Sequence, residues 1–305
     1  MLHKTYIIIV TYNGEQWIRK SLDSCIGINV IVVDNNSTDQ TLKIIETEYP
    51  KVILLKQKKN LGFGRANNLG ISHALQNDCD YVFLLNQDAY LEKDAIDRII
   101  AVHKNNLEYG ILSPVHLNGA GNKLDKNFSS YLRYDANNFI FRDAFKNKLN
   151  EVYQITFVNA AAWLLPKETL QKIGGFDPIF FHYGEDDNYC QRAIYHDLKI
   201  GVVPKAFVKH DRENVVKRPL DTEAQKLLNL ETQIKINYAD LNRVNDDFNK
   251  LIKYKFNFFI KLIIKLKLKK ASFIYKKYMI LKTSKNQIIA SKGLNIKEGS
   301  NYLNF

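Results

Sequence analysis

Two groups of acidic residues in the sequence have surroundings that suit chemistry. Asp88 follows the apolar run 81–85 and the amides Asn86 and Gln87. A short apolar run bounded by polar residues predicts a strand buried on both faces. Ligands of open α/β sheets bind in the crevice beyond the carboxyl ends of such strands. A carboxylate at that place can bind a divalent cation, and the cation can bind a diphosphate.

The second group is the run Glu185-Asp186-Asp187, which is followed by Asn188. Three adjacent carboxylates repel one another, and this repulsion raises at least one of their pKa values. Aromatic residues flank the run, at 180–183 and at Tyr189. A solvated surface run rarely has such neighbours, so we expect these carboxylates to line a site.

The elements that would position both groups follow from the pattern of apolar residues. We expect strands at 6–10, 30–33, 52–55 and 81–85, and helices at 15–25, 41–48 and 69–75. Strands alternating with helices at this spacing predict βαβ units and a mostly parallel, Rossmann-like sheet flanked by helices. The loop Gly62-Phe63-Gly64 can bind phosphate in principle, but it has neither the dinucleotide fingerprint nor the P-loop pattern.

Composition restricts the class of protein. A chain of 305 residues has room for one large domain and an appendage. The net charge is +12, and 20 of the 44 basic but only 9 of the 32 acidic residues lie from Asp211 onward. The three cysteines have no Cys-x-x-Cys spacing, which argues against a disulfide scaffold or a zinc site and suits a reducing compartment. The apolar runs are too short for a signal peptide core or a transmembrane helix.

Several motifs together carry a resemblance to a known family. In chain order they are 11–13 (Thr-Tyr-Asn), 33–39 (Val-Asp-Asn-Asn-Ser-Thr-Asp), 60–68 (Asn-Leu-Gly-Phe-Gly-Arg-Ala-Asn-Asn), 85–88 (Leu-Asn-Gln-Asp), 159–163 (Asn-Ala-Ala-Ala-Trp), 174–177 (Gly-Gly-Phe-Asp) and 182–192. The ordered set resembles the family 2 glycosyltransferases, in their rhamnosyltransferase-like branch, over residues 6–210. The resemblance implies a GT-A fold, an inverting mechanism and a nucleotide-sugar donor. We expect a catalytic domain at 1–212, with its nucleotide-sugar half at about 1–115 and its acceptor half at about 116–212, and a helical, lysine-rich region at 213–305.

The resemblance implies the donor-binding residues. It places Thr11, Tyr12 and Asn13 around the nucleobase and ribose, and it places Asp34 on a pyrimidine ring nitrogen. The same site would include Asn36, Gly62, Arg65, Asn68, Asn86, Gln87 and Asp88. An alternative for Asp34 and Asn36 is ordinary turn chemistry before a helix. Arg65 starts a helix, where a cation adds to the positive end of the dipole, so a phosphate partner is favoured over a solvated arginine.

The metal site departs from the usual pattern of the family, which has two acidic residues flanking one position at this strand end. Here the run is Asn86-Gln87-Asp88, with one carboxylate. The resemblance implies that Asp88 binds Mn²⁺ or Mg²⁺, with His210 as a second ligand and the donor diphosphate supplying further oxygens. Imidazole suits Mn²⁺ better than Mg²⁺. The alternative for His210 is a packed histidine at a strand end.

The catalytic residues are implied in the same way. The Glu-Asp motif of the family corresponds to Glu185-Asp186, which makes Asp186 the general base that deprotonates the acceptor hydroxyl. Asn188 stands where relatives commonly have a second Asp, so Asp187 is an alternative base. Arg192, one helical turn later, would orient the acidic group or hold a phosphate. Trp163 and Ala161 would lie on the acceptor side, and the alternative for Trp163 is a core residue.

The C-terminal region is basic and apolar together. Thirteen lysines lie between Lys250 and Lys292, and no acidic residue occurs between Asp247 and Glu298. Aromatic and aliphatic residues alternate with these lysines, which is typical of an interfacial helix attracted to anionic lipid. The alternative is a helix packed on the catalytic domain with its lysines outward. Nucleic-acid binding is disfavoured, because no nucleic-acid module is recognisable.

These observations predict an inverting glycosyltransferase of cell-surface polysaccharide biosynthesis. The donor would be dTDP-L-rhamnose or a UDP-hexose, and the acceptor would be a glycan or a lipid-linked sugar. The enzyme would be cytoplasmic and peripheral to the inner face of the membrane, and an oligomer is possible. One rival is a nucleotidyltransferase on a similar sheet, which would leave Glu185 and Asp186 without a task. Another is a non-catalytic sugar- or lipid-binding protein.

Overall fold

The structure, a computed structural model, describes residues 3–134, 139–212, 222–243 and 247–305. The chain forms two compact units, residues 1–215 with 298–305 (the sheet unit) and residues 216–297 (the helical unit). The last eight residues, which the sequence analysis assigned to the C-terminal region, therefore belong to the sheet unit. Asn301 accepts the backbone N–H of Gly175, and the Tyr302 hydroxyl donates to Asp177 at 3.0 Å.

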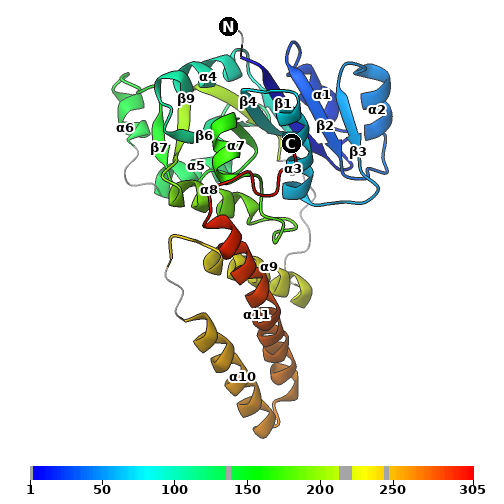
Figure 1. The fold of residues 1–305 in the computed structure, drawn as a ribbon, viewed down its shortest axis with the longest axis vertical. Helices are drawn as coiled ribbons and strands as arrows, with labels where there is room; N and C mark the ends of the chain where they lie inside the picture. The colour runs from blue at the N-terminus through cyan, green and yellow to red at the C-terminus, as the bar shows by residue number, and fades with distance from the viewer. Residues whose placement is uncertain (1–2, 135–138, 213–221, 244–246) are drawn as a thin grey trace. The chain divides into compact units, whose positions relative to one another are not determined.

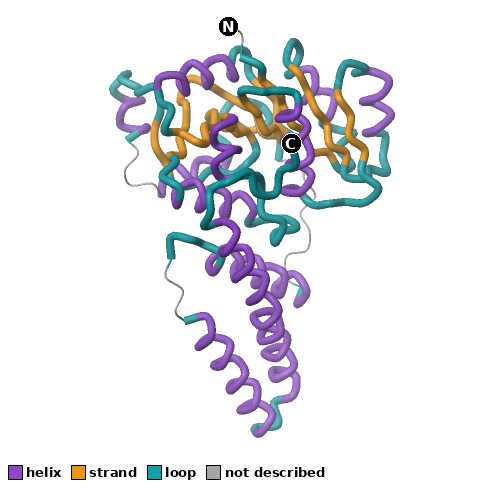
Figure 2. The backbone as a smooth tube through the Cα atoms, in the orientation of Figure 1, coloured by secondary structure: helices purple, strands orange, loops and turns teal. Residues whose placement is uncertain are grey.

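Within the described residues, nine strands form one sheet in the order β3-β2-β1-β4-β8-β6-β9-β5, with β7 also paired to β9 (Figures 1 and 2). The strands are β1 (Thr5–Thr11), β2 (Asn29–Asp34), β3 (Ile53–Lys56), β4 (Tyr81–Asn86), β5 (Ala89–Leu91), β6 (Tyr109–Asn118), β7 (Tyr153–Ile155), β8 (Ala162–Pro166) and β9 (Lys199–His210). The four predicted strands are all present. They pair in parallel from β3 to β4, whereas antiparallel pairs of β8, β5 and β7 make the rest of the sheet mixed.

Alternation of side chains along each strand creates a hydrophobic core on both faces of the sheet. In β1, Ile8 joins one cluster while Ile7 and Ile9 join the other. The first face is covered by α3 (Phe63–Gln76), α5 (Lys126–Tyr134), α6 (Ile140–Phe145), α7 (Lys167–Ile173) and α8 (Glu185–Tyr195). The second face is covered by α1 (Ile18–Asp23), α2 (Thr41–Glu48) and α4 (Ala95–Asn105). Strands β1 and β2, which are buried on both faces, are accordingly rich in β-branched residues.

Two of the predicted helices differ in length from the prediction. Helix α1 begins at Ile18, because the preceding residues form a turn in which the carbonyl of Gly14 accepts the N–H groups of Trp17 and Ile18. Helix α3 begins at Phe63, immediately after Gly62, well before the predicted start at Leu69. The turn therefore ends at Gly62, and Phe63 and Gly64 already belong to the first turn of α3.

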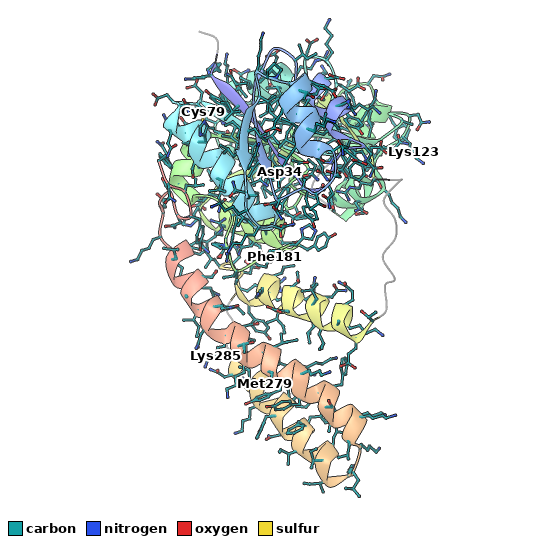
Figure 3. All side chains as sticks on the ribbon, turned by 90° about the vertical axis from the view of Figure 1, so that its right-hand side faces the viewer. Asp34, Cys79, Lys123, Phe181, Met279 and Lys285 are labelled. Carbon is teal, nitrogen blue, oxygen red and sulfur yellow. The ribbon has the colours of Figure 1, made fainter. Side chains whose placement is uncertain are left out.

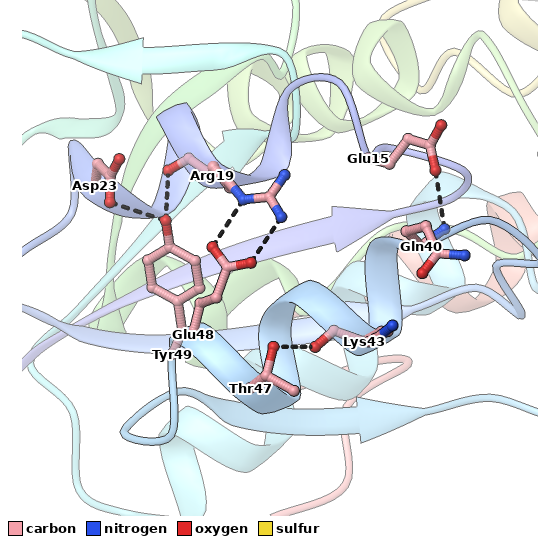
Figure 4. A network of polar contacts seen from close by, with 8 residues as sticks. All are labelled: Glu15, Arg19, Asp23, Gln40, Lys43, Thr47, Glu48 and Tyr49. Atoms are coloured by element: carbon pink, nitrogen blue, oxygen red, sulfur yellow. Dashed lines mark hydrogen bonds and ion pairs between the residues drawn. The ribbon is translucent and has the colours of Figure 1, made fainter.

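Helices α1 and α2 are joined by a polar network (Figure 4). The guanidinium of Arg19 donates two hydrogen bonds to Glu48, at 2.7 and 2.6 Å. The Tyr49 hydroxyl donates to Asp23 at 2.8 Å, and Glu15 accepts the backbone N–H of Gln40 at 2.9 Å. Because Glu15 and Gln40 lie in the loops after β1 and β2, the network holds these two loops together at the carboxyl ends of the strands.

The helical unit consists of α9 (Glu223–Tyr238), α10 (Phe248–Ile264) and α11 (Leu268–Asn295). Helices α10 and α11 form a hairpin, in which Phe259 and Tyr275 lie with ring centroids 5.1 Å apart (Figure 1). Lys276 of α11 pairs with Glu223 of α9 at 2.7 Å. Among the described residues, no helix combines the length and the apolar character that crossing a bilayer requires.

Candidate active site

The carboxyl ends of three parallel strands meet at one edge of the sheet. Thr11 of β1 pairs with Asp34 of β2, and Val10 pairs with Asn86 of β4. The side-chain amide of Gln87 closes this edge. Its Oε1 accepts from the Thr11 hydroxyl at 2.7 Å and from the Tyr12 N–H at 2.9 Å. The predicted donor residues of β1, β2 and β4 therefore converge, because parallel strands end on the same side of a sheet.

Asp34 is fully buried at the end of β2 (Figure 3). Its Oδ2 accepts the backbone N–H of Ser37 at 3.0 Å, whereas its Oδ1 has no hydrogen-bond partner in the described structure. A buried acceptor without a partner is energetically costly, by about 1–3 kcal/mol. The turn function considered for Asp34 therefore uses one oxygen, and the second oxygen remains available to the N–H of a ligand.

The loop before α3 is held by Asn35. Its Nδ2 donates to Gly62 O at 3.1 Å, and its Oδ1 accepts the Leu61 N–H at 3.1 Å. Gly62 has φ +80°, and a Cβ at this position would lie 2.0 Å from the carbonyl oxygen of Phe181. Only glycine fits this conformation and this close approach. Arg65, in the first turn of α3, donates to Pro178 O at 3.0 Å. Gly62 and Arg65 therefore both contact the segment 178–181, which precedes the acidic run.

The two predicted metal ligands come together. Oδ1 of Asp88 lies 3.4 Å from Nε2 of His210, and the buried His210 pairs with Ala89 across β5 and β9. Nε of Arg212 donates to the His210 ring at 3.1 Å. No group of three or more His, Cys, Asp or Glu side chains suited to a metal ion occurs in the described parts of the chain. The protein thus offers one carboxylate and one imidazole, and a bound diphosphate would have to complete the coordination.

A second histidine, His116, packs against His210. His116 of β6 is fully buried, and its ring centroid lies 6.0 Å from that of His210 in an edge-to-face arrangement. Its Nε2 lies 3.0 Å from the Ser113 hydroxyl, and its ring stacks on Phe128. Burial, followed by the charges of His210 and Arg212, holds the pKa of His116 well below its usual value. His116 is therefore neutral and limits the movement of the His210 ring.

The acidic run forms the first turn of α8. Burial raises the pKa of Glu185 to about 8, with further contributions from Asp186 and Asp187. Burial and the neighbouring Asp186 raise the pKa of Asp187 to about 7. The pKa of Asp186 is also raised by burial, although hydrogen bonds from the backbone of Asp187 and Ala160 and the charge of Arg212 oppose the rise. The pKa values of Glu185 and Asp187 therefore lie near neutral pH, as is common for groups in active sites.

The acidic run lies beside the strand ends. Ala160 contacts the carboxylate of Asp186 through its backbone N–H, and the next carbonyl, that of Ala161, accepts the N–H of Asn86 at 2.9 Å. Arg212 interacts with Asp186 and also donates to His210. The acidic turn of α8, the Asp88–His210 pair and the ends of β1, β2 and β4 are thus parts of one candidate site.

Two predicted substrate contacts are wrong. Trp163 is fully buried in β8, where its ring stacks on Phe176 with centroids 6.1 Å apart, so it cannot stack on a sugar. Arg192 is also buried, and its guanidinium donates to the carbonyls of Ile173 and Gly175 and, at 3.1 Å, to Asn188. It holds the backbone of the core together, and its buried position keeps it away from a phosphate in solvent. Both residues are core residues because α8 and β8 turn these side chains inward.

Some of the remaining predicted residues are buried or hydrogen-bonded within the protein, and others are exposed to solvent. The Asn68 amide is used by the backbone of Phe176, to which Nδ2 donates at 2.8 Å and from which Oδ1 accepts at 2.7 Å. Ala161 is buried and contributes its backbone carbonyl, whereas Tyr12 is 48% exposed. Asn13 and Asn36 have positive φ values of 47° and 66°, which Asn tolerates in tight turns. These two turns present their exposed faces beside Asp34.

Sequence reasoning did not single out three residues that the structure places at the site. Arg212 links His210 to Asp186, as described above. Phe181 and Tyr183 are 62% and 66% exposed in the segment just before the acidic run (Figure 3 labels Phe181). Tyr183 has φ +69°, a strained conformation for an aromatic residue, and such strain is concentrated at functional sites. The aromatic run 180–183 was the available signal for the last two, since exposed aromatic residues next to carboxylates are uncommon.

Comparisons with known proteins agree with this geometry. Residues 6–174 match the sequence profile of the family described as Glycosyl transferase family 2. A Haloferax volcanii protein named low-salt glycan biosynthesis hexosyltransferase Agl10 is 24% identical over 208 residues, which are 66% of this chain and 65% of that protein. The Shigella flexneri dTDP-rhamnosyl transferase RfbF is 24% identical over 216 residues, which are 67% of this chain and 68% of that protein. The chain thus spans just under two thirds of the first relative.

Two further proteins extend the comparison. The Mycobacterium tuberculosis N-acetylglucosaminyl-diphospho-decaprenol L-rhamnosyltransferase is 23% identical over 231 residues, which are 68% of this chain and 75% of that protein. The crystal structure of GalNAc-T7 with UDP, GalNAc and Mn²⁺ superposes with a TM-score of 0.56 at 14% identity, over 78% of this chain and 50% of that chain. This structural likeness shows a shared fold and confirms the predicted GT-A class.

The family profile covers more than half of the chain and includes the ends of β1, β2 and β4. Five of the seven motifs that suggested the resemblance, those between residues 11 and 163, lie within the matched region, whereas the motif at 182–192 lies beyond it. The chain is a member of glycosyl transferase family 2.

Proposed function

We propose that the protein transfers a sugar from a nucleotide-sugar donor to a glycan or lipid-linked acceptor, with inversion at the anomeric carbon, in the synthesis of a surface polysaccharide. One observation carries the proposal: the buried Asp34, the Asp88–His210 pair and the raised-pKa run of α8 share one edge of the sheet. Relatives named as a hexosyltransferase and as rhamnosyltransferases support the same class of reaction.

The donor is proposed to be dTDP-L-rhamnose, with a UDP-hexose as the alternative. The unpaired Oδ1 of Asp34 would accept the ring N–H of a thymine or uracil, while Asn13 and Tyr12 border the ribose. A charged acceptor makes a stronger hydrogen bond than a neutral one. Arg65 lies at the start of α3, where its guanidinium would face the diphosphate. Cytosine lacks that ring N–H, so a CDP donor is disfavoured by the same contact.

A divalent cation would be held by Asp88 and His210, and the oxygen and nitrogen donors of this pair suit Mn²⁺. When bound, such a cation neutralises negative charge on the leaving diphosphate. The protein's own residues perform the remaining steps. Asp186 accepts the proton of the acceptor hydroxyl as the oxygen attacks the anomeric carbon from the side opposite the diphosphate. The positive charge of Arg212 stabilises the ionised form of Asp186, because this charge lowers the pKa of the Asp186 carboxyl and opposes the rise caused by burial.

The acceptor is proposed to lie against the exposed rings of Phe181 and Tyr183, in place of the buried Trp163. Aromatic faces contribute both apolar area and a defined orientation. A lipid-linked acceptor would bring the enzyme to the cytoplasmic face of the membrane, and the lysine-rich helical unit would provide the peripheral contact. An oligomer is compatible with this arrangement.

A thermal-shift panel tests the donor site. The protein would be incubated with dTDP, UDP, GDP and CDP, each with and without Mn²⁺. A ligand at about 100 times its Kd adds roughly 2.7 kcal/mol of stability. We expect dTDP or UDP to raise the unfolding midpoint by several degrees, with a larger effect in Mn²⁺, and GDP and CDP to have little effect. No shift with any nucleotide would refute the proposed function.

A product assay separates the rival activities. With the matching donor and acceptor, we expect release of the nucleoside diphosphate and formation of a glycosidic bond of inverted configuration. Release of pyrophosphate would indicate a nucleotidyltransferase instead. Full biological function in an Asp186→Asn variant would indicate a non-catalytic binding protein.

A further inference from the structure

The turn of the α10–α11 hairpin exposes an unusual set of apolar side chains. We call residues 261–270 the hairpin tip. Within it, Ile264 is 76% exposed, Leu266 is 82% exposed and Leu268 is 61% exposed. These residues follow one another at alternate positions where α10 ends and α11 begins. Single exposed apolar residues are common, but three adjacent large ones indicate a contact surface.

The pairing of the two helices explains why apolar side chains are most exposed at the tip: Tyr254, Phe256 and Ile260 of α10 are only 40–59% exposed. Upstream apolar residues of α10 are used within the hairpin, where Phe256 contacts Tyr278 with ring centroids 5.2 Å apart and Leu262 is buried. The chain then reverses, so the tip has no partner helix. Leu266 adopts φ +54°, a conformation that favours glycine or asparagine. A leucine kept in that strained position points to a task for its side chain outside the fold.

The charge of the tip is entirely positive. Every charged residue in it is a lysine: Lys261, Lys265, Lys267, Lys269 and Lys270. The sequence has no acidic residue between Asp247 and Glu298, so these lysines have no acidic neighbour along the hairpin. Lysines attract anionic lipid headgroups, and their alkyl chains can extend along the apolar boundary while the charge stays at the headgroups.

A crevice of about 340 Å³ adjoins the tip, between the two helices. Its lining is mainly apolar and includes two lysines of the tip. The lining residues are Phe258, Leu262, Lys269, Lys270, Phe273 and Ile274. A mainly apolar crevice that also contains cationic groups matches one part of a phospholipid, an acyl chain with its phosphate. The tip therefore complements an anionic bilayer in both charge and apolar character.

We propose that the hairpin tip inserts end-on into the headgroup region of an anionic phospholipid bilayer. End-on insertion is favoured over a helix lying flat in the interface, because the most exposed large apolar residues of the helical unit are those of the tip, and α10 pairs with α11 above it through Phe256–Tyr278 and Phe259–Tyr275. The described helices do not span a bilayer, so the depth is interfacial. This proposal rests on the proposed function in one respect: the purpose of the insertion would be to bring the sheet unit to a lipid-linked acceptor.

Vesicle co-sedimentation of the full chain tests the insertion. The probes are vesicles of phosphatidylcholine alone and of phosphatidylcholine with phosphatidylglycerol in equal parts. We expect binding to the anionic vesicles only, weakened by added salt. The variant Ile264→Asp/Leu266→Asp/Leu268→Asp should lose at least ten-fold in vesicle affinity. Its matched control is Ile26→Asp/Leu107→Asp, which changes residues that are 81% and 72% exposed on the sheet unit and should bind like the parent.

The lysines are tested in the same way. A quadruple variant replaces Lys265, Lys267, Lys269 and Lys270 by Gln. Because one lysine near an anionic surface contributes about a five-fold change in affinity, this variant should lose far more than ten-fold. The control replaces four exposed lysines of the sheet unit by Gln: Lys43, Lys51, Lys93 and Lys104. Equal losses in both variants would mean general charge attraction and would overturn a role specific to the tip.

A thiol label reports insertion directly. The native cysteines Cys25, Cys79 and Cys190 are all buried, so Leu266→Cys adds an exposed thiol for an environment-sensitive fluorophore. We expect a blue shift on anionic vesicles for a label at position 266 and none for a label at Ile26→Cys. A blue shift for a label at Lys285→Cys as large as that at 266 would indicate a flat helix and overturn end-on insertion.

Two further readouts keep this proposal separate from the proposed function. Nucleotide binding by thermal shift should be unchanged in the triple Asp variant. If nucleotides bind but the parent does not bind anionic vesicles, the insertion is refuted while the transferase proposal stands. Sedimentation velocity without lipid completes the test, because a parent dimer that dissociates in the triple Asp variant would assign the tip to self-association instead.

Discussion

The carboxylate of Asp88 lies 3.4 Å from Nε2 of His210, although the two residues are far apart in the sequence. The register of β5 and β9 produces this pair, because Ala89 is opposite His210 and the N–H of Asp211 donates to Asp88 O at 2.8 Å. A short strand immediately after the end of β4 thus places the carboxylate beside the imidazole. The pair, with Arg212 beside it, connects the carboxyl ends of β1, β2 and β4 to the acidic turn of α8.

The first prediction concerns the cation. Asp88→Asn and His210→Ala should each remove the additional stabilisation that Mn²⁺ gives to the complex with dTDP or UDP, because each removes one of the two protein ligands. We expect a 10- to 100-fold loss of nucleotide affinity in Mn²⁺, of the order seen for changes around metal ligands, and little change without metal. Isothermal titration would measure both values. His73→Ala, on the outer side of α3, is the control, and equal effects with and without Mn²⁺ would remove Asp88 and His210 from the cation site.

The second prediction separates the two candidate bases. Asp186→Asn should lower kcat by at least about 100-fold, since general-base catalysis contributes 10²–10⁴-fold. Asp187→Asn should retain activity but shift the acidic limb of the pH–rate profile to lower pH. The physical reason is that neighbouring carboxylates disfavour each other's ionised form, as the raised pKa of Asp187 beside Asp186 indicates, and the variant removes one charge. If Asp187→Asn is the inactive variant and Asp186→Asn is active, the roles are reversed.

The third prediction concerns stability and its dependence on pH. Burial raises the pKa of Glu185 from 4.5 to about 8. An acid whose pKa is higher in the folded state stabilises the fold when protonated. This contribution to the free energy of unfolding is fully present below about pH 4.5. It is lost as the pH rises from 4.5 to 8, at about 1.4 kcal/mol for each pH unit. Glu185→Gln should therefore raise the unfolding midpoint of the sheet unit by several degrees at pH 8 and by less at pH 5.

Differential scanning calorimetry at both pH values would measure this change. Glu168→Gln, on an unrelated helix, provides the control for a generic loss of negative charge. A midpoint that falls at pH 8 in the Glu185 variant would show that the ionised carboxylate stabilises the fold, contrary to the cause assigned here. The variant is also expected to lose activity, since removing strain from an active site commonly trades stability against function.

The fourth prediction distinguishes an acceptor contact from a core residue. Phe181→Ala and Tyr183→Ala should raise the KM for the acceptor by about ten-fold or more, because stacking contributes about 0.5–1.5 kcal/mol beyond buried area. Their effect on stability should be small, since both rings are exposed. Trp163→Ala should instead destabilise the sheet unit by about 3–5 kcal/mol. Phe145→Ala, at a ring that is 90% exposed elsewhere, is the kinetic control. Unchanged acceptor kinetics in both loop variants would exclude this acceptor surface.

Patterns confined to short segments could be interpreted directly from the amino-acid sequence. The short apolar runs predicted β1 to β4, and helix α2 has the expected limits, because apolar periodicity and turn residues act over a few positions. The family followed from motifs at the ends of those strands. The antiparallel strands β5, β7 and β8 were not predicted, because their pairing depends on partners that are distant in the chain.

Side-chain direction could not be predicted in the same way. Trp163 and Phe181 are both aromatic residues next to candidate site motifs, yet one is fully buried and the other is 62% exposed. The difference arises from packing, since β8 lies between β4 and β6 while Phe181 lies in the loop before α8. Asn68 and Arg192 likewise satisfy backbone groups of 173–176, which no local pattern indicates.

The sequence alone was sufficient for the family, the order of the first elements and the basic character of the C-terminal region, because these properties depend on residue type and short-range spacing. Only the tertiary structure decided that Arg212 lies beside His210, that the residues from Glu298 onward belong to the sheet unit, and that the most exposed apolar residues of the hairpin lie at its tip. These facts depend on contacts between distant segments. Such contacts are selected by the burial of apolar surface over the whole unit, which no single stretch of sequence specifies.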